Sequence, residues 1–187
     1  MTGSSRCLTA KKSSGFSSTE LLIVLGLILI VTVMSIPSLR RTLDAYRGSA
    51  AVHGIAGQLA LSRMRAASDF TRTKLVIDTT NQTYVRQVMT DKTLGTYATE
   101  GGTQYLPQGV SFGFGSITSP AGGQTSISQT TEIIFNSRGI PIDSGGTPIS
   151  TDAIYLNNNA GAYYVVSVNT TGQIRTWQYY AGAWVTE

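Results

Sequence analysis

The sequence has few of the side chains that most catalytic and metal sites require. Its 187 residues include one cysteine, Cys7, and one histidine, His53. A single cysteine cannot form a disulfide within the chain, and we interpret a lone histidine on a predicted helix as structural or solvated. Paired histidines, the HExxH and GxSxG patterns and a Walker loop are all absent from the sequence. Asp143 and Asp152 flank a loop, but their spacing is not that of an EF-hand. We therefore predict no enzyme activity, no cofactor and no metal site.

An excess of charge of one sign is also absent from most of the chain. The whole sequence has 14 Lys and Arg against 10 Asp and Glu, but Arg6, Lys11 and Lys12 precede Gly15. The chain after Gly15 therefore has eleven basic against ten acidic residues, and from Phe70 onward six basic residues oppose seven acidic ones. Nucleic-acid binders usually concentrate positive charge. The near-neutral C-terminal part does not favour general nucleic-acid binding.

Long apolar runs are absent except for one near the N-terminus. Leu21–Ile36 contains no charged residue, Glu20 precedes it and Pro37 follows it. Counted from Phe16 to Pro37, the segment has 22 residues, which as a helix span roughly 33 Å, enough to cross the apolar core of a bilayer. A charge in the apolar part of such a segment costs roughly 2.5–3.5 kcal/mol, which makes Glu20 a candidate functional residue.

Two ordinary alternatives apply to this segment, a cleaved secretory signal and a plain single-pass anchor. The run is at the long end for a signal peptide, and no small-residue cleavage site follows it. It is short for a plain anchor, which needs about 20 apolar residues. Lys11 and Lys12 stand before the run, and positive flanking residues favour the cytoplasmic side, so the C-terminal bulk is expected outside the cytoplasm.

The residues after Pro37 predict a second helical half that reaches about Asp69. Apolar residues recur there at steps of three and four. Gly48, Gly54 and Gly57 oppose this helix, since each costs about 1 kcal/mol relative to alanine. The expected apolar stripes consist of Leu39, Leu43, Tyr46 and Ala50, followed by Val52, Ile55 and Leu59 with Leu61 and Met64 beside them.

From Thr71 onward the sequence predicts strands separated by loops rich in glycine, serine and threonine. A polar turn, Thr80-Asn81-Gln82, predicts a hairpin between the first two strands. Aromatic residues gather near the C-terminus, either as alternating core and surface of a last strand or as a contact surface. The predicted strands are Lys74–Thr79, Thr83–Met89, Val110–Phe114, Glu132–Asn136, Ala153–Asn157, Tyr163–Val168 and Gln173–Tyr180, and the predicted loops are Gly95–Tyr105, Thr118–Thr131 and Asp143–Thr151.

The N-terminal pattern resembles that of type IV pilins and type II secretion pseudopilins. Gly15 and Phe16 match the family's processing site, Glu20 matches its glutamate and Pro37 its helix proline. The resemblance implies that a prepilin peptidase removes residues 1–15 and that the new Phe16 amine is N-methylated. It also implies that Glu20 drives filament assembly and that Pro37 breaks the helix.

Three further segments resemble the GspH/FimT group of minor pilins and pseudopilins: Leu61–Ala67, Ile134–Gly139 and Thr171–Arg175. The resemblance implies an α+β pilin fold, in which a long N-terminal helix, one half in the membrane and one half packed, lies on antiparallel β-sheets. The expected organisation is a leader at 1–15, a transmembrane and assembly helix at 16–37, an amphipathic stem helix at 38–69 and a β-rich periplasmic head at 70–187.

The expected function is that of a minor pseudopilin near the tip of a type II secretion pseudopilus. Its expected partners are other pilin or pseudopilin subunits, the prepilin peptidase and the bacterial inner membrane. The alternative is a minor pilin of a type IV pilus that binds DNA during uptake. The FimT branch binds DNA through a motif of glycine, arginine, any residue and arginine, to which Gly172 and Arg175 correspond, whereas Gln173 replaces the first arginine. Arg175 is therefore the candidate DNA contact. A periplasmic enzyme is a third, weaker reading.

Overall fold

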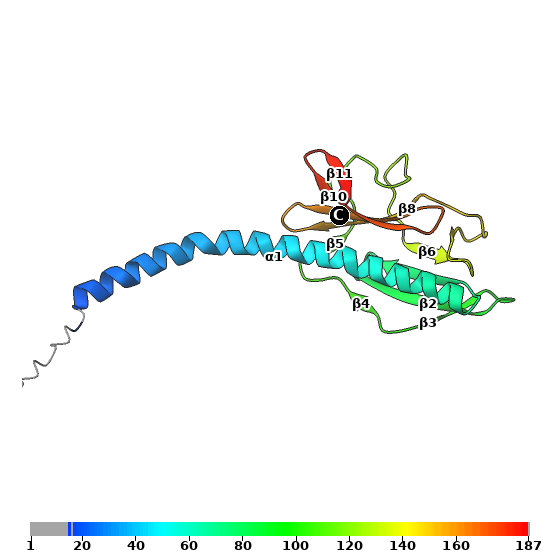
Figure 1. Ribbon diagram of the computed structural model, residues 1–187, viewed down its shortest axis with the longest axis horizontal. Helices are drawn as coiled ribbons and strands as arrows, with labels where there is room; N and C mark the ends of the chain where they lie inside the picture. Colours follow the sequence, from blue (N-terminus) through cyan, green and yellow to red (C-terminus); the bar gives the residue numbers. More distant parts are fainter. Residues whose placement is uncertain (1–14, 16, 187) are drawn as a thin grey trace, which may run out of the picture. The chain divides into compact units, whose positions relative to one another are not determined.

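The computed structural model describes residue 15 and residues 17–186 (Figure 1). The chain divides into two compact units, the second of which begins at Arg41. Helix α1 (Ser18–Ser68) contributes its first part to the N-terminal unit and its second part to the unit that holds the strands. The predicted α+β class, a long N-terminal helix followed by antiparallel sheets, is confirmed.

Helix α1 is continuous across Pro37. The helix break that the sequence predicts at this residue is therefore not observed, and that prediction is wrong. Proline lacks a backbone N–H and so removes one hydrogen bond to the carbonyl four residues earlier. The proline ring also crowds that carbonyl, which can kink a helix without ending it, and here the residues on both sides of Pro37 remain helical.

The first sheet has six strands in the order β3-β2-β1-β6-β7, with β4 also paired to β2, and every pairing is antiparallel. The predicted hairpin between its first two strands is confirmed, and the Asp78 carboxylate accepts hydrogen bonds from the backbone N–H groups of Thr80 and Asn81 at 2.9 Å. The strands are β1 (Thr73–Asp78), β2 (Thr83–Asp91), β3 (Thr96–Thr99), β4 (Gln104–Tyr105), β6 (Glu132–Phe135) and β7 (Pro141–Ile142).

The segment Gly95–Tyr105, predicted to be a loop, contains β3 and β4, so that prediction is wrong. Both strands are short and their residues are mostly exposed, so they lack the buried alternation that identifies a strand in a sequence. They form because β2 is nine residues long and pairs with both of them along one edge.

The second sheet has five strands in the order β11-β10-β9-β8-β5, again all antiparallel. Its central strands lie within one residue of their predicted bounds, whereas β11 was not predicted. The strands are β5 (Val110–Phe112), β8 (Asp152–Asn158), β9 (Tyr163–Val168), β10 (Ile174–Tyr180) and β11 (Ala183–Thr186).

The main core lies between the second half of α1 and both sheets. From the helix, Val52, Ile55 and Leu59 are fully buried in it. The sheets contribute Leu75, Ile77, Tyr84, Val110, Phe112, Ile133, Phe135, Ile154, Leu156, Tyr164, Val166 and Val168. The predicted head at 70–187 therefore shares its core with the stem helix.

A smaller cluster covers the opposite face of the second sheet. Tyr155 and Val165 belong to it, whereas their strand neighbours Ile154 and Val166 belong to the main core, as the alternation of side chains along a strand requires. Ala121 packs here from the predicted loop Thr118–Thr131, and its N–H donates to the Tyr155 hydroxyl at 3.0 Å. This loop is therefore a packed cover of the sheet.

Candidate assembly surface

The large apolar side chains of Leu21–Ile36 are all exposed, by 43% at Val24 to 76% at Met34. None of the most apolar stretch of α1 is buried. Within the described residues, α1 is the one helix that is long and apolar enough to cross a membrane. Burying one such side chain is worth about 1.5–3 kcal/mol. An uncovered helix of this kind therefore requires a lipid or protein environment that the chain itself does not supply.

Polar side chains inside this segment bond to its own backbone. The Thr32 hydroxyl donates to the Ile28 carbonyl at 2.7 Å, and the Ser35 hydroxyl donates to the Val31 carbonyl at 2.8 Å. These bonds reduce the cost of placing hydroxyl groups in an apolar surrounding. The helix surface thus remains compatible with lipid over its whole apolar length.

Glu20 lies in the first turn of α1 and is exposed. Helical hydrogen bonding begins just before it, where the Leu21 N–H donates to the Ser17 carbonyl at 3.1 Å. The partial positive charge at a helix start stabilises a carboxylate there, although by no more than about 1 kcal/mol at an exposed site. Phe16, whose amine is the expected partner of this carboxylate, lies outside the described residues, as do residues 1–14 of the predicted leader.

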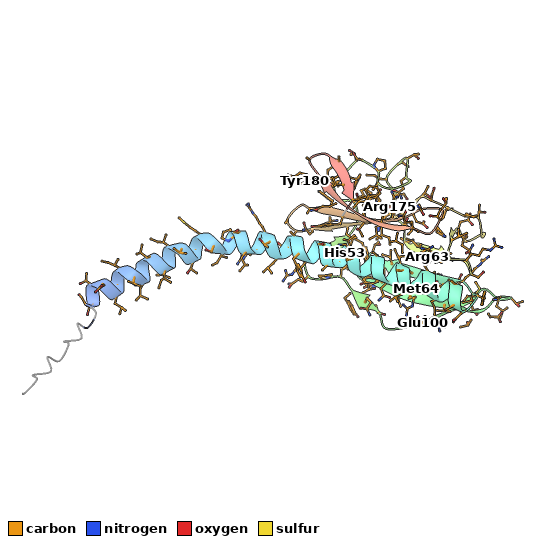
Figure 2. The ribbon with its side chains drawn as sticks, viewed as in Figure 1. His53, Arg63, Met64, Glu100, Arg175 and Tyr180 are labelled. Carbon is orange, nitrogen blue, oxygen red and sulfur yellow. The ribbon has the colours of Figure 1, made fainter. Side chains whose placement is uncertain are left out.

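The second half of α1 carries one buried and one exposed apolar face. The predicted stripe Val52, Ile55 and Leu59 lies in the core. Leu61 and Met64, which were predicted beside this stripe, are exposed, so that part of the prediction is wrong. Tyr46 is 72% exposed, and Met64 (Figure 2) is 60% exposed. We name the outward set Leu43, Tyr46, Gly57, Leu61 and Met64 the outer stripe. Within it, a Cβ added at Gly57 would meet nothing within 4 Å, so its lack of a side chain has no packing reason inside the chain.

Close contacts hold the start of the stem against the second sheet. A Cβ added at Gly48 would lie 2.3 Å from Cε2 of Tyr164, so the aromatic ring occupies the space that any other residue would fill. The Tyr164 hydroxyl donates to the Ala45 carbonyl at 3.3 Å, and the Asn158 amide donates to the Asp44 carbonyl at 3.1 Å. This glycine, unlike Gly57, is required by the fold.

The two head segments that resemble the GspH/FimT group form the same kind of turn. The side-chain oxygen of Asn136 accepts hydrogen bonds from the N–H groups of Arg138 and Ile140 at 2.9 and 3.1 Å. The side-chain oxygen of Asn169 accepts them from Thr171 and Gln173 at 3.0 and 2.9 Å. Each turn closes with a glycine of positive φ, Gly139 at 71° and Gly172 at 76°.

These two turns meet each other and the stem. A Cβ added at Gly172 would lie 2.2 Å from the Gly139 carbonyl oxygen and 3.0 Å from Nε of Arg63. The Arg63 guanidinium also donates to the Thr171 carbonyl at 3.4 Å. Residues from three parts of the sequence thus form one junction, and the turn glycines have a structural role there.

Arg175, the candidate DNA contact, lies in β10 and is exposed (Figure 2). Its guanidinium donates to the side-chain oxygen of Gln173 at 3.2 Å. The residue that stands in place of the motif's first arginine therefore orients the second one, and it adds no charge.

Several cations of the stem and first sheet are paired with acids. Glu100 accepts Arg65 at 2.9 Å and Arg86 at 3.2 Å, and Lys74 pairs with Glu132 at 3.1 Å. Ion pairs that solvent still reaches contribute about 1 kcal/mol or less to stability. Their consequence here is that they reduce the positive charge available to a polyanion.

His53 is exposed on the stem helix, whereas Asp143 and Asp152 lie in two different environments of the head. The Asp143 carboxylate accepts the Thr147 N–H at 2.7 Å and so closes a turn. Asp152 is 6% exposed at the start of β8, and its Oδ2 has no hydrogen-bond partner among the described residues. Burial, together with the nearby Glu132 charge, raises the pKa of Asp152 from 3.8 to about 7. Nothing in the sequence pattern predicted that this carboxyl group would be buried.

No protein-family model matches the chain, and no curated protein matches it. Among solved structures, the chain is similar to two structures of the minor pseudopilin EpsH from the type 2 secretion system of Vibrio cholerae. One is 9% identical with a TM-score of 0.49, and the match covers 70% of this chain and 95% of that one. The other is 12% identical with a TM-score of 0.48, and the match covers 70% of this chain and 92% of that one.

Proposed function

We propose that this chain is a minor pseudopilin, a structural subunit of a type II secretion pseudopilus located near its tip. The observation that carries the proposal is the uncovered apolar helix Leu21–Ile36 with Glu20 in its first turn. Before assembly the helix spans the inner membrane and the head lies in the periplasm. During assembly the same apolar surface packs on neighbouring subunits.

The N-terminal residues supply the processing and assembly chemistry. Cleavage after Gly15 exposes the Phe16 amine, which is then methylated. The Glu20 carboxylate pairs with the Phe16 amine of a neighbouring subunit or of its own chain. In an apolar surrounding an unpaired carboxylate is costly, and a cation beside it offsets that cost. This pairing favours the assembled state over the isolated subunit.

The outer stripe, on the second half of α1, supports the same proposal. Exposed Tyr46, Leu61 and Met64 offer apolar area, and Gly57 allows a second helix to approach closely. DNA uptake remains the alternative function. It is less favoured because Gln173 replaces an arginine and because acids pair with Arg65, Arg86 and Lys74.

The first test replaces Glu20 by alanine in the host bacterium. We expect normal removal of the leader but strong loss of the subunit from the sheared filament fraction, measured by immunoblot and mass spectrometry. Asp69→Ala is the matched control, since it removes an exposed acid directly after the end of α1, far along the chain from the apolar segment. Normal incorporation of Glu20→Ala would contradict the role of this carboxylate. Export and DNA-uptake assays on a deletion strain distinguish the pseudopilus from the pilus.

The second test uses the absence of cysteine from the chain after Gly15. A cysteine introduced by Leu61→Cys should form disulfide-linked pairs with a cysteine on the stem of a neighbouring subunit. Thr170→Cys, an exposed position in a turn away from the outer stripe, is the control and should give none. Equal cross-linking from both positions would show that the outer stripe is not the packing face.

A further inference from the structure

A hollow of about 540 Å³ lies at the C-terminal end of α1. Its walls come from the residues that follow the helix, from the turn between β2 and β3 and from the turn after β6. This size is in the range of sites that bind small molecules or short peptide segments. The lining residues are Phe70, Thr71, Arg72, Met89, Lys92, Thr93, Leu94, Gly95, Asn136 and Ser137.

Phe70 has an unusual backbone conformation for its residue type. The Thr71 N–H donates to the Ala66 carbonyl at 3.2 Å, the bond that ends a helix when the intervening residue is left-handed. Phe70 is that residue, with φ of 50°, where glycine is preferred and other residues cost about 1–2 kcal/mol. Its side chain is 74% exposed, so burial within the chain does not offset this cost.

Leu94 is the second apolar side chain at the rim, and it is 75% exposed. The Asp91 carboxylate holds the surrounding turn by accepting the N–H groups of Thr93 and Leu94 at 2.7 and 3.1 Å. The Asp91 carboxylate is therefore hydrogen-bonded within the turn. Two large apolar groups are thus presented to solvent on a fixed backbone.

The walls of the hollow are tied together, and its charge is positive. The Thr71 hydroxyl donates to the Met89 carbonyl at 3.1 Å, and the Met89 N–H donates to the Arg72 carbonyl at 2.9 Å. The Lys92 ammonium donates to the Phe70 carbonyl at 3.0 Å, which places a cation at the rim beside the backbone of Phe70. Arg72 and Lys92 line the hollow, and no acidic side chain of the described residues does.

We infer that this hollow binds an acidic segment of a partner protein. An apolar side chain of the segment packs on Phe70 and Leu94, and its carboxylates lie against Arg72 and Lys92. Two cations are suited to one or two carboxylates, whereas a nucleic acid requires a longer track of positive charge. The nearby Arg65 does not extend the track, because it pairs with Asp69 and Glu100. The inference is independent of the proposed assembly function, since the hollow contains no residue of the outer stripe.

The test selects peptides from a random seven-residue library displayed on phage. The full chain, held in nanodiscs of zwitterionic lipid, is the target, and the double variant Lys92→Glu with Leu94→Ser is the counter-target. Both positions are exposed, so the fold should tolerate the changes, which circular dichroism checks. The matched control variant is Arg175→Glu with Tyr180→Ser, which removes an exposed cation and an exposed aromatic residue on β10.

We expect the selected peptides to combine aspartate or glutamate with a large apolar residue. Synthetic copies should bind the Lys92→Glu, Leu94→Ser chain at least about tenfold more weakly than the unchanged chain, as loss of a charge-assisted contact implies. The control variant should bind them as the unchanged chain does. Failure to enrich peptides, enrichment without acidic residues, or equal binding by the double variant would each overturn the inference. Equally strong, Lys92-dependent binding of a single-stranded oligonucleotide would overturn it in favour of a polyanion site.

Discussion

Replacing Asp152 by asparagine should stabilise the head at neutral and alkaline pH. This carboxyl group is 6% exposed, and its Oδ2 has no hydrogen-bond partner among the described residues. Burial disfavours the charged form, and the charge of Glu132 adds to the effect, so the pKa rises from 3.8 to about 7. Asparagine has nearly the same shape and no charge, so it removes this cost.

The sign of the pH dependence follows from the direction of the shift. Between pH 3.8 and about 7 the folded state keeps the proton of Asp152 and the unfolded state has lost it. The free energy of unfolding therefore falls as the pH rises through this range, and then levels off. A shift from 3.8 to about 7 corresponds to about 4 kcal/mol at most. The Asp152→Asn variant should lack this decrease.

The assay is urea unfolding followed by circular dichroism at several pH values between 4 and 8. A fragment beginning at Leu39 is suitable, because the unit that begins at Arg41 holds the whole core. We expect this fragment to be soluble and rich in β-structure. Subtracting the two proteins cancels other groups, including Asp78, whose pKa is lowered by hydrogen bonds from Asn81 and Thr80. Equal stability differences at pH 4 and pH 8 would refute the reasoning.

Three further predictions concern single residues. Gly48→Ala should destabilise the fragment by about 1–3 kcal/mol, because the new methyl group meets Tyr164. Gly57→Ala, in contrast, should stabilise the fragment by up to about 1 kcal/mol. Urea midpoints in the reverse order would contradict this. Replacing Gly15 by arginine should leave a full-length precursor in the membrane, and a mature protein with another N-terminus in mass spectra would exclude the predicted cleavage site. In gel-shift titrations near physiological salt the fragment should bind duplex DNA weakly at most; submicromolar affinity that is lost on Arg175→Ala would favour DNA uptake.

For the stem helix, the sequence predicted an apolar periodicity but not which apolar side chains would be buried. Periodicity predicted the helical halves and the stripe Val52, Ile55 and Leu59, since a step of three or four residues places side chains on one face. It wrongly placed Leu61 and Met64 beside that stripe, although both are exposed. It did not tell which stripe the chain itself covers. Val52, Ile55 and Leu59 are buried and Tyr46 and Met64 are exposed because the sheets pack on one side only. The position of the sheets depends on contacts between distant parts of the sequence.

By itself, the sequence determined the features that depend on neighbouring residues. These are the apolar segment Leu21–Ile36 with Glu20 before it, the hairpin between β1 and β2 and the long buried strands of the second sheet. The length and polarity of a segment and the residues of its turns involve only neighbouring positions, so these features can be predicted from the sequence alone. Continuity of the helix across Pro37 could not be predicted in this way, because an interior proline can either kink a helix or end it.

Only the tertiary structure decided which distant residues meet. Gly139 and Gly172 lie more than 30 positions apart in the sequence, yet their turns pack together on Arg63. The hollow beside Phe70 joins the end of α1, the β2–β3 turn and the turn after β6. Burial of Asp152 likewise arises from packing around β8. Each of these features follows from the pairing of strands and the packing of the helix on the sheets. These contacts join residues that are far apart in the sequence, and the local sequence around one residue does not predict its distant neighbours.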